Sequence, residues 1–362
     1  MKVLFTTTVP SPYRVDFFNE LGKYCDLTVV FERNKFVDRD KSWENFKFEN
    51  FQGIFLSKSG MSTIFADSQS AIKLIKKQSF DKIVVTNFST PIGILIVNFL
   101  KRTKTPYFLE SDGAFAKKSK GLKEIFKKRI ISGAEGYFST AKEHDEYYKS
   151  YGVSADKMIR YHFSSVCNCD VVSEPTSDKL KKELRDKLGI KEDKVVLAIG
   201  QFIYRKGFDT LIRAAVNLSS DIGFYFVGGE PTEEYLSLKD ELKLDNVHFV
   251  GFKGKPELKE YYMSADVFVH PTRLDIWGLV INEAMAYGLP VITTTKCIAG
   301  LEMLSDKRMI VEPEMSNSLS DVINQLLNDD DLRNRISKEN LKTAAEYTIE
   351  TMCADHVRLF NL

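Results

Sequence analysis

The sequence predicts an α/β fold made of two doubly wound domains, each a parallel sheet with helices on both faces. Three observations lead to this prediction. The chain is 362 residues long, which exceeds the size at which a single hydrophobic core usually keeps growing. Short apolar runs alternate with amphipathic helical stretches in both halves, a pattern typical of parallel sheets. Residues 167–178, CNCDVVSEPTSD, lose that periodicity and include Pro175, which indicates a linker.

The expected elements follow from the spacing of the apolar residues. In the first half, strands are expected at residues 2–8, 27–31, 83–86, 107–110 and 136–139. Helices are expected around residues 15–21, 72–77, 92–100, 122–131 and 143–151. In the second half, strands are expected at residues 195–199, 224–227, 247–250, 267–269 and 291–293, again with helices between them.

A final helix is expected at about residues 348–360. It carries Met352, His356 and Phe360 every four residues, so it presents a face that needs a partner. The sequence therefore predicts a first domain at residues 1–170, a second domain at 171–345, and a last segment, 346–362, that returns to the first domain.

The composition is that of a globular protein, because 43% of the residues are hydrophobic and 28% are charged, which excludes a disordered chain. The five cysteines are an odd number without zinc-ribbon or C-x-x-C spacing, so we expect reduced thiols. No apolar run is long enough to span a bilayer, and the first residues lack the features of a signal peptide. We expect a cytoplasmic protein that is either soluble or peripheral at the cytoplasmic membrane face.

Charge is divided unevenly along the chain. Residues 1–170 carry 27 Lys and Arg against 19 Asp and Glu, a balance of +8, whereas the remainder balances at −7. Residues 117–129 alone hold seven cations and one anion, and an apolar stripe at helical spacing accompanies them: Leu122, Ile125, Phe126 and Ile130. Such a segment, 117–130, is typical of contact with a lipid surface such as the inner membrane, and equally of a core-facing stripe beneath solvated cations. No recognition helix or aromatic-interleaved basic strand accompanies the charge, so nucleic acid is not an expected partner.

Two loops of the second half predict a site for a diphosphate. Residues 200–207, GQFIYRKG, follow a strand and bring Arg205 and Lys206 to its carboxyl end. Gly278 opens a helix whose first N–H groups face the end of another strand, and such a terminus attracts anions. A planar guanidinium, a point charge and a helix N-terminus together suit a diphosphate. The alternative is that both cations are solvated loop residues.

Other strand ends contribute further candidates. Glu283 is a carboxylate in an otherwise apolar helix, and it either accepts the two hydroxyl protons of a ribose or belongs to a local network. Gly228 ends a strand where glycine permits a ligand to approach the backbone, and Phe252 follows another strand end in the sequence VGF. Because ligands of open parallel sheets bind at the carboxyl ends of the strands, these residues are expected to share a cleft between the two domains.

The segments GQFIYRKGFDTLIRA, VHFVGF and ADVFVHPTRLDIWGLVINEAMAYGLPVI, in this order and spacing, resemble the donor domain of the retaining glycosyltransferases of family 4. The resemblance covers residues 194–330 strongly and the first half mainly by architecture. It implies the GT-B fold, in which two Rossmann-like domains face each other across a cleft. It also implies a nucleotide diphosphate sugar as co-substrate, UDP- or GDP-linked, with no cofactor and no metal.

The resemblance assigns roles to the donor-site candidates. Lys206 and Arg205 would hold the donor diphosphate, Glu283 the ribose, and the amides near Gly278 and Leu279 the sugar-phosphate end.

Two positions depart from the family pattern. The first acidic residue of the family's pair, which holds the donor sugar, is Asp275 here and is one methylene shorter than the usual glutamate. A displacement of about 1 Å in a positioning group costs on the order of 100-fold in rate, so either the loop compensates or the donor sugar differs. Gln201 replaces the arginine that often follows the earlier glycine, so Arg205 is expected to be the second diphosphate cation.

The first half offers signals for the acceptor. Asp112, in the sequence ESDG after a strand, is either a polar residue of the acceptor site or a turn aspartate before glycine. Arg14 follows the first strand, where it either meets an acceptor phosphate or caps a surface. His144 is expected on a helix surface and His162 near the edge between the domains, neither of them catalytic. Retention in this family is described as a front-face displacement in which the leaving phosphate takes the acceptor's proton, so no dedicated base is expected.

The sequence thus predicts a retaining, metal-independent hexosyltransferase that moves a sugar to a saccharide or lipid-linked glycan during bacterial polysaccharide assembly, such as capsule, O-antigen, exopolysaccharide or cell-wall glycan. Two alternatives remain open. One is a nucleotide-sugar epimerase of the same fold, which would carry acid and base residues of its own in the cleft. The other is a weakly active sugar-nucleotide-binding module, suggested by Asp275 and by the lack of a histidine next to Asp112.

Overall fold

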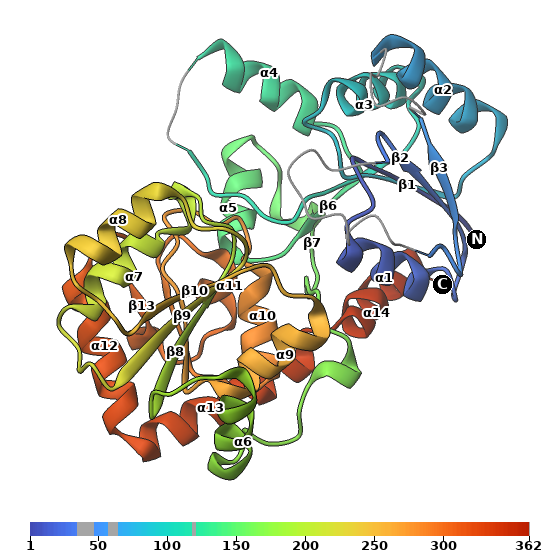
Figure 1. Ribbon diagram of the computed structural model, residues 1–362. Coiled ribbons are helices and arrows are strands. Elements are labelled where there is room, and N and C mark those ends of the chain that lie inside the picture. Colours follow the sequence, from blue (N-terminus) through green and yellow to red (C-terminus); the bar gives the residue numbers. More distant parts are fainter. Residues whose placement is uncertain (35–46, 57–63, 118–120, 362) are drawn as a thin grey trace. The chain divides into compact units, whose positions relative to one another are not determined.

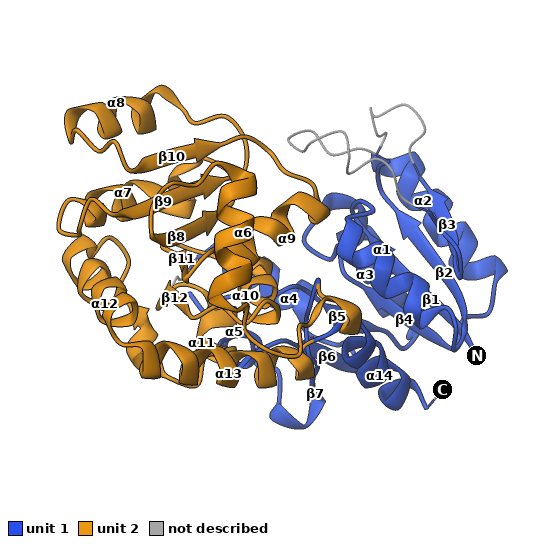
Figure 2. Ribbon diagram, turned by 60° about the horizontal axis from the view of Figure 1, so that its bottom comes forward, with its two compact units in different colours: residues 1–165, 348–362 blue, residues 166–347 orange. Residues whose placement is uncertain are grey.

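The computed structural model describes residues 1–34, 47–56, 64–117 and 121–361. The chain forms two compact units, one of residues 1–165 with 348–362 and the other of residues 166–347 (Figure 2). Each unit is a doubly wound α/β domain, which confirms the fold class predicted from the sequence. Among the described helices, none combines the length and the apolar character needed to cross a membrane.

The first unit is built on a seven-stranded sheet in the order β3-β2-β1-β4-β5-β6-β7, with all paired neighbours parallel (Figure 1). Its strands are β1 (Lys2–Thr7), β2 (Asp26–Phe31), β3 (Gln52–Phe55), β4 (Lys82–Val85), β5 (Phe108–Glu110), β6 (Gly136–Ser139) and β7 (Met158–Arg160). The sequence analysis missed β3, whose residues are exposed or half-buried. It lacks the buried apolar run by which the other strands are recognised.

The helices of the first unit pack in two groups. They are α1 (Pro12–Leu21), α2 (Ile64–Lys77), α3 (Pro91–Thr103), α4 (Leu122–Ile131), α5 (Lys142–Ser150) and α14 (Ile349–Phe360). α1 packs with α14, whereas α2 packs with α3 on the other face of the sheet (Figure 1). Both α1 and α3 begin with proline, which has no N–H to leave unpaired in a first turn.

The last helix of the chain, α14, finds its partner in the first unit. The ring of His356 is fully buried and lies 4.8 Å from the ring of Phe17 in α1 and 4.4 Å from that of Phe138 in β6. Phe360 lies 5.9 Å from Phe108 in β5. The predicted face of this helix is therefore covered by the sheet and α1, as the fold class requires.

The second unit holds a six-stranded parallel sheet in the order β10-β9-β8-β11-β12-β13. Its strands are β8 (Lys194–Ile199), β9 (Ile222–Val227), β10 (Val247–Val250), β11 (Val267–His270), β12 (Val291–Thr294) and β13 (Ile310–Val311). Its helices are α6 (Asp178–Leu188), α7 (Phe208–Ala215), α8 (Glu233–Glu241), α9 (Lys255–Ser264), α10 (Leu279–Ala286), α11 (Ile298–Met303), α12 (Ser316–Asn328) and α13 (Asp330–Glu346).

These helices cover both faces of the second sheet. α7, α8 and α12 pack on one face, and α6, α9, α10 and α13 lie on the other (Figure 2). The strand order reverses at β8, which pairs with β9 on one side and β11 on the other. In open α/β sheets, ligands bind at the carboxyl ends of the strands where the order reverses. The loops that follow β8 and β11 are therefore the place to look for a site.

Candidate functional site

The loop after β8 is tied to the loop after β11 by backbone contacts. The carbonyl oxygen of Arg205 accepts from the Arg273 N–H at 2.8 Å and from the Thr272 hydroxyl at 2.9 Å. The Arg205 side chain donates to the Leu274 carbonyl at 2.7 Å. Two segments that are distant in the sequence thus form one rigid corner, and this corner brings Lys206 to Asp275.

Lys206 and Asp275 form a nearly buried ion pair. Nζ of Lys206 lies 2.7 Å from Oδ2 of Asp275, and their side chains are 13% and 12% exposed. Arg205 approaches the same oxygen at 3.5 Å. Burial by itself raises the pKa of a carboxyl group, but the hydrogen bond from His270 and the charge of Lys206 outweigh it, so the pKa of Asp275 lies well below its usual range. The alternative that Lys206 is a solvated loop cation is wrong, because the side chain is buried against a carboxylate.

His270 is a site residue that the sequence analysis missed. It ends β11, is fully buried, and places Nε2 3.1 Å from Oδ2 of Asp275. Burial and the nearby charge of Lys206 lower the pKa of His270 below its usual value. The signal available in the sequence was a histidine at the carboxyl end of a predicted strand, five residues before Asp275.

The start of α10 fits the predicted anion site. Gly278 is the residue before the helix and has φ of 105°, a conformation that favours glycine. A Cβ there would lie 2.7 Å from Sγ of Cys297 and 3.7 Å from Nε2 of His270. Only glycine therefore fits above the His270 and Cys297 side chains, and α10 begins at the next residue, Leu279, four positions after Asp275.

Glu283 lies one turn further along α10 and is half-buried. Its Oε2 accepts from the hydroxyl of Tyr262 in α9 at 2.8 Å. The Tyr262 ring in turn stacks on Tyr287 with centroids 5.2 Å apart. A local contact therefore orients this carboxylate, as one of the two sequence interpretations expected, and the ribose role stays a prediction.

The remaining donor candidates lie at the carboxyl ends of neighbouring strands. Gln201 lies just after β8, Gly228 directly follows β9, and Phe252, which is exposed, follows β10. A Cβ on Gly228 would lie 2.0 Å from the carbonyl oxygen of Gly200. The backbone at Gly228 thus lies against the backbone at Gly200, after the neighbouring strand β8. This contact within the protein is enough to explain why the residue is glycine.

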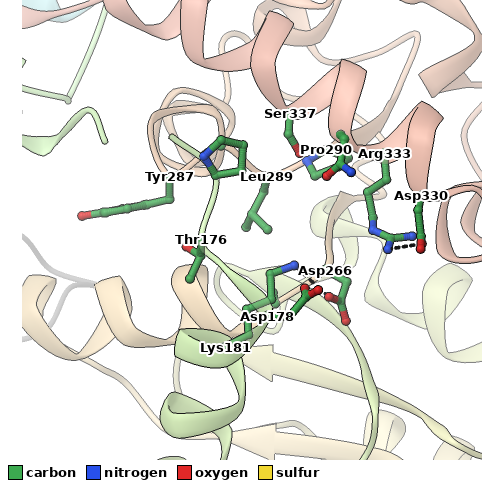
Figure 3. A pocket seen from close by; sticks show the side chains of 14 residues that line it. Thr176, Asp178, Lys181, Asp266, Tyr287, Leu289, Pro290, Asp330, Arg333 and Ser337 are labelled. Carbon is green, nitrogen blue, oxygen red and sulfur yellow. Dashed lines mark hydrogen bonds and ion pairs between the residues drawn. The ribbon is translucent and has the colours of Figure 1, made fainter. Parts of the chain in front are cut away.

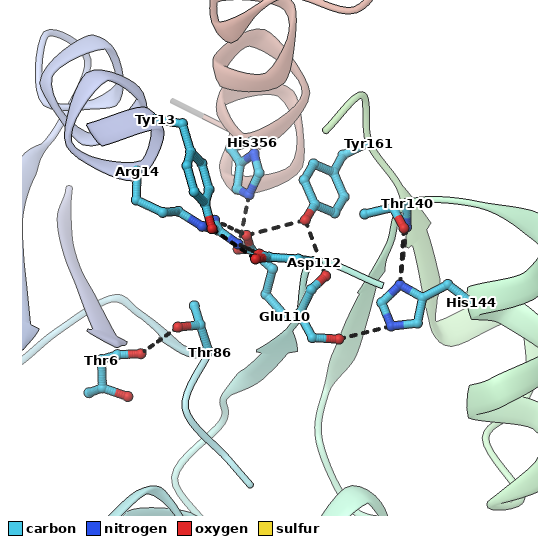
Figure 4. Close-up of polar contacts among 11 residues, drawn as sticks. Thr6, Tyr13, Arg14, Thr86, Glu110, Asp112, Thr140, His144, Tyr161 and His356 are labelled. Carbon is cyan, nitrogen blue, oxygen red and sulfur yellow. Dashed lines mark hydrogen bonds and ion pairs between the residues drawn. The ribbon is translucent and has the colours of Figure 1, made fainter. Parts of the chain in front are cut away.

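In the first unit, a buried ion cluster occupies the carboxyl end of β5 (Figure 4). Arg14 of α1 donates to Glu110 and, at 2.6 Å, to Oδ1 of Asp112, while Tyr13 donates to Oδ2 of Asp112 at 2.8 Å. Burial raises the pKa of Glu110, but the charge of Arg14 and the hydrogen bond from His356 together outweigh burial and lower that pKa to about 2. Neither expectation for Arg14, an acceptor phosphate or a surface cap, describes its place, because it is buried between two carboxylates.

One of the two histidines named in the sequence analysis, His144, differs from its predicted surroundings. His144 is fully buried, not on a helix surface, and burial lowers its pKa to about 3. Its Nδ1 accepts from the Thr140 N–H at 3.3 Å, so the neutral ring carries its proton on Nε2 and donates to the Ser111 hydroxyl at 3.0 Å (Figure 4). The ring of His162 lies 2.8 Å from Asp355 of α14, within the first unit.

The basic segment 117–130 is described except for residues 118–120. In α4, Leu122, Ile125 and Phe126 are 85%, 68% and 50% exposed, while Ile130 is buried. The alternative of a core-facing stripe is therefore wrong for the first three residues, because the buried residues of α4 are Ile130 and Ile131 at its end.

A pocket of about 80 Å³ lies at the opposite edge of the second sheet (Figure 3). Residues immediately before β11 and β12 line it, including Asp266 and Pro290. Two of the lining cations are engaged there, Lys181 with Asp266 at 2.9 Å and Arg333 with Asp330 in α13. Since it lies at the amino ends of the strands, this pocket is separate from the donor-site candidates.

The comparison with known families agrees with this geometry. Residues 181–343 match the family model described as glycosyl transferases group 1. This segment, called the group 1 segment below, is therefore similar to that family. The group 1 segment contains Lys206, His270, Asp275 and Glu283, and so includes the whole corner built by the loops after β8 and β11.

Individual relatives of the group 1 segment cover different shares of the chain. The lipopolysaccharide glucosyltransferase WaaG of Escherichia coli K12 is 32% identical over 158 residues, which are 41% of each protein. The chain thus spans less than half the length of that relative. Sucrose-phosphate synthase from Thermosynechococcus elongatus superimposes with a TM-score of 0.80 at 18% identity, over 100% of this chain and 98% of that one. Anabaena HepE in complex with UDP and glucose gives 0.78 at 15% identity, over 100% and 99%. At these identities the likeness shows the fold alone, which is the predicted GT-B fold.

Proposed function

We propose that this protein transfers a sugar from a nucleotide diphosphate sugar to a hydroxyl of a saccharide or lipid-linked glycan in bacterial polysaccharide assembly. The observation that carries the proposal is the corner in which Lys206 and Arg205 meet Asp275, with α10 beginning four residues later at Leu279. Two cations and a helix N-terminus suit a diphosphate, and a carboxylate beside them suits sugar hydroxyls. That relatives of the group 1 segment include a glucosyltransferase, and that a structure of the same fold is a complex with UDP and glucose, supports this assignment.

The donor site works through charge and orientation. Lys206 and Arg205, with the N–H groups at Gly278 and Leu279, would carry the growing negative charge of the leaving diphosphate, a role that a divalent ion has in other transferases. Glu283, oriented by Tyr262, would accept the ribose hydroxyls. We propose that the reaction needs no metal and no cofactor.

We further propose that the anomeric configuration is retained. The leaving phosphate oxygen would take the proton of the acceptor hydroxyl on the same face of the sugar. Asp112 is a weak candidate for a base, because both its carboxylate oxygens already accept, from Arg14 and Tyr13. It is one-third exposed, so its role would be to orient an acceptor hydroxyl at the carboxyl end of β5.

The exposed face of α4 supports contact with an anionic lipid surface at the cytoplasmic side of a membrane. Leu122, Ile125 and Phe126 lie at positions i, i+3 and i+4, so they share one face of the helix. Exposed Lys123, Lys127, Lys128 and Arg129 flank them, against the single acid Glu124. Apolar side chains enter the headgroup region while cations meet lipid phosphates. Such a surface would bring the enzyme to a lipid-linked acceptor.

Vesicle co-sedimentation tests the lipid contact. The protein should bind phosphatidylglycerol vesicles and not phosphatidylcholine vesicles, and a variant with Leu122, Ile125 and Phe126 all changed to Asn should lose binding. A control with Phe65→Asn removes an exposed aromatic of α2 and should bind like the parent. Equal binding to both vesicle types, or full binding by the triple variant, would show that α4 does not contact lipid.

The transfer proposal is tested with a panel of UDP-, GDP- and dTDP-sugars, measuring thermal shift and release of the nucleotide. Lys206→Met should abolish the shift, whereas Lys259→Met, at an exposed position of α9, should preserve it. The proposal fails if no nucleotide sugar raises the melting temperature of the parent protein.

The two alternatives predict different products in the same panel. An epimerase would convert the nucleotide sugar without releasing nucleotide, and a binding module would give a thermal shift without turnover. The glycosyltransferases among the relatives favour transfer over epimerisation.

A further inference from the structure

His270 holds the carboxylate of Asp275 from beneath the donor site. The histidine ends β11 and is fully buried, and the aspartate lies in the loop that follows. The backbone of Asp275 is itself fixed, because its N–H donates to the Lys296 carbonyl at 2.8 Å and its carbonyl accepts from the Ile298 N–H at 3.3 Å. The side chain can therefore move only by rotating about its own bonds.

The tautomer of His270 follows from its surroundings. Its pKa is lowered by burial, so the ring is neutral, and its Nε2 faces an ionised carboxylate, which can only accept. Nε2 therefore carries the proton and donates to Asp275. Nδ1 is left as an acceptor, buried and without a hydrogen-bond partner among the described residues. An unpaired acceptor in the interior lowers the stability of the fold. The histidine therefore contributes through Nε2, the nitrogen that contacts Asp275.

All the polar contacts that the structure gives to the Asp275 side chain, within the described residues, end on one oxygen. Lys206 at 2.7 Å, His270 at 3.1 Å and Arg205 at 3.5 Å all meet Oδ2. Oδ1 is thus the oxygen left to accept from a ligand.

We propose that His270 is a positioning residue for Asp275 during donor binding. This inference rests on the proposed function. In the protein without a bound donor, the Asp275 carboxylate forms an ion pair with the Lys206 ammonium. A diphosphate competes for the same ammonium, which sits on a flexible four-carbon stem and can turn to it. His270, fixed at the end of a buried strand, cannot follow. It keeps Oδ2 in place, so that Oδ1 faces a hydroxyl of the donor sugar.

The arrangement also bears on the shorter acidic residue. A glutamate side chain is one methylene longer and extends further toward a ligand. The shorter Asp275 is instead held in one position, by the N–H of His270 at its carboxylate and by two hydrogen bonds at its backbone. His270 would then compensate for the missing methylene of Asp275, a role that the sequence analysis gave to the loop.

The test uses side chains that differ in where they carry an N–H. His270→Gln keeps a donor at the position of Nε2, His270→Asn carries its donor at the position of Nδ1, and His270→Phe carries none. Calorimetry gives the affinities for UDP and UDP-glucose, and for GDP and GDP-mannose if the panel selects guanosine. The ratio of the two affinities reports the contribution of the sugar.

We expect His270→Phe and His270→Asn to lower that ratio about tenfold, as for a lost hydrogen bond to a charged group. Their affinity for the nucleotide alone should stay close to the parent value. The rate of donor hydrolysis should fall on the order of 100-fold, and His270→Gln should restore most of both.

Two results would overturn the proposal. One is an equal loss of affinity for the nucleotide and the nucleotide sugar in all three variants, which is what a purely structural residue would give. The other is parent-like behaviour of His270→Phe. A parent protein that binds no nucleotide at all would instead refute the proposed function. In that case the imidazole ¹⁵N spectrum still tests the contact between His270 and Asp275. The Nε2 resonance of His270 should be that of a protonated nitrogen, and it should shift in Asp275→Asn.

Discussion

Breaking the Lys206–Asp275 pair from each side separates its contribution to stability from its contribution to chemistry. In Lys206→Met, the buried carboxylate keeps two side-chain partners within the part of the chain that the structure describes, Arg205 at 3.5 Å and His270 at 3.1 Å. Removing one partner of a buried ion pair costs about 3–5 kcal/mol. Because two partial replacements remain, we expect the lower end of that range, about 3 kcal/mol of unfolding free energy.

The reverse substitution and the double variant complete the cycle. Asp275→Asn removes the anion and leaves Lys206 nearly buried, for which we expect a loss of about 2 kcal/mol. Replacing both partners leaves no buried charge without a counterion. The loss of unfolding free energy in the double variant should therefore be about 2 kcal/mol smaller than the sum of the two single losses. Turnover should not recover with stability, because the diphosphate still lacks Lys206. We expect it to stay on the order of 100-fold or more below the parent.

Trp277 makes the stability measurement specific to the second unit in a background where Trp43, the other tryptophan of the sequence, is changed to Phe. Trp277 is 2% exposed and lies two residues after Asp275, so its fluorescence in urea reports unfolding around the site. Additive losses in the double variant would refute the coupling between the two side chains. A double variant that regained turnover along with stability would refute the diphosphate role of Lys206.

Three other residues give separate predictions. Gly278→Ala places a Cβ 2.7 Å from Sγ of Cys297, so calorimetry should show UDP affinity about tenfold lower or worse as the first N–H groups of α10 move. The pKa of Glu110, about 2 against the usual 4.5, stabilises the first unit above pH 4.5. Urea titrations should show this stabilisation, about 3 kcal/mol, fading as the pH falls from 4.5 to 2, and Glu110→Gln should lack that dependence. Glu283→Gln should bind UDP about tenfold more weakly and inorganic pyrophosphate as the parent does, again by calorimetry.

Much of the fold could be read from the sequence because its signals are local. Alternation of apolar strands and amphipathic helices is visible along the chain, and it predicts both parallel sheets. Two strands of the first sheet were missed, β3 and β7, and both are exposed or half-buried and so carry no such signal. They lie at the two edges of the sheet, where pairing with β2 and β6 decides their places.

The donor-site residues could be proposed from loop positions, but their partners could not. Lys206 and Asp275 are 69 positions apart, and whether a loop cation is solvated or paired depends on which loop folds against it. Arg14 and Glu110 are 96 positions apart, and the prediction for Arg14 was wrong for that reason. His144 was misplaced because the sequence shows a helix but not which of its faces is covered.

The sequence by itself determined the doubly wound architecture of the two halves, the group 1 segment and the loops that carry its charged residues. The spacing of apolar residues and the positions of glycines determine the local conformation of each short stretch of backbone, because both act between residues that are close in the sequence. The tertiary structure alone decided which charges are neutralised, which oxygen of Asp275 is left for a ligand, and that His270 belongs to the site. Burial and hydrogen bonding depend on neighbours in space, and these neighbours come from strands and loops that only the folded sheet brings together.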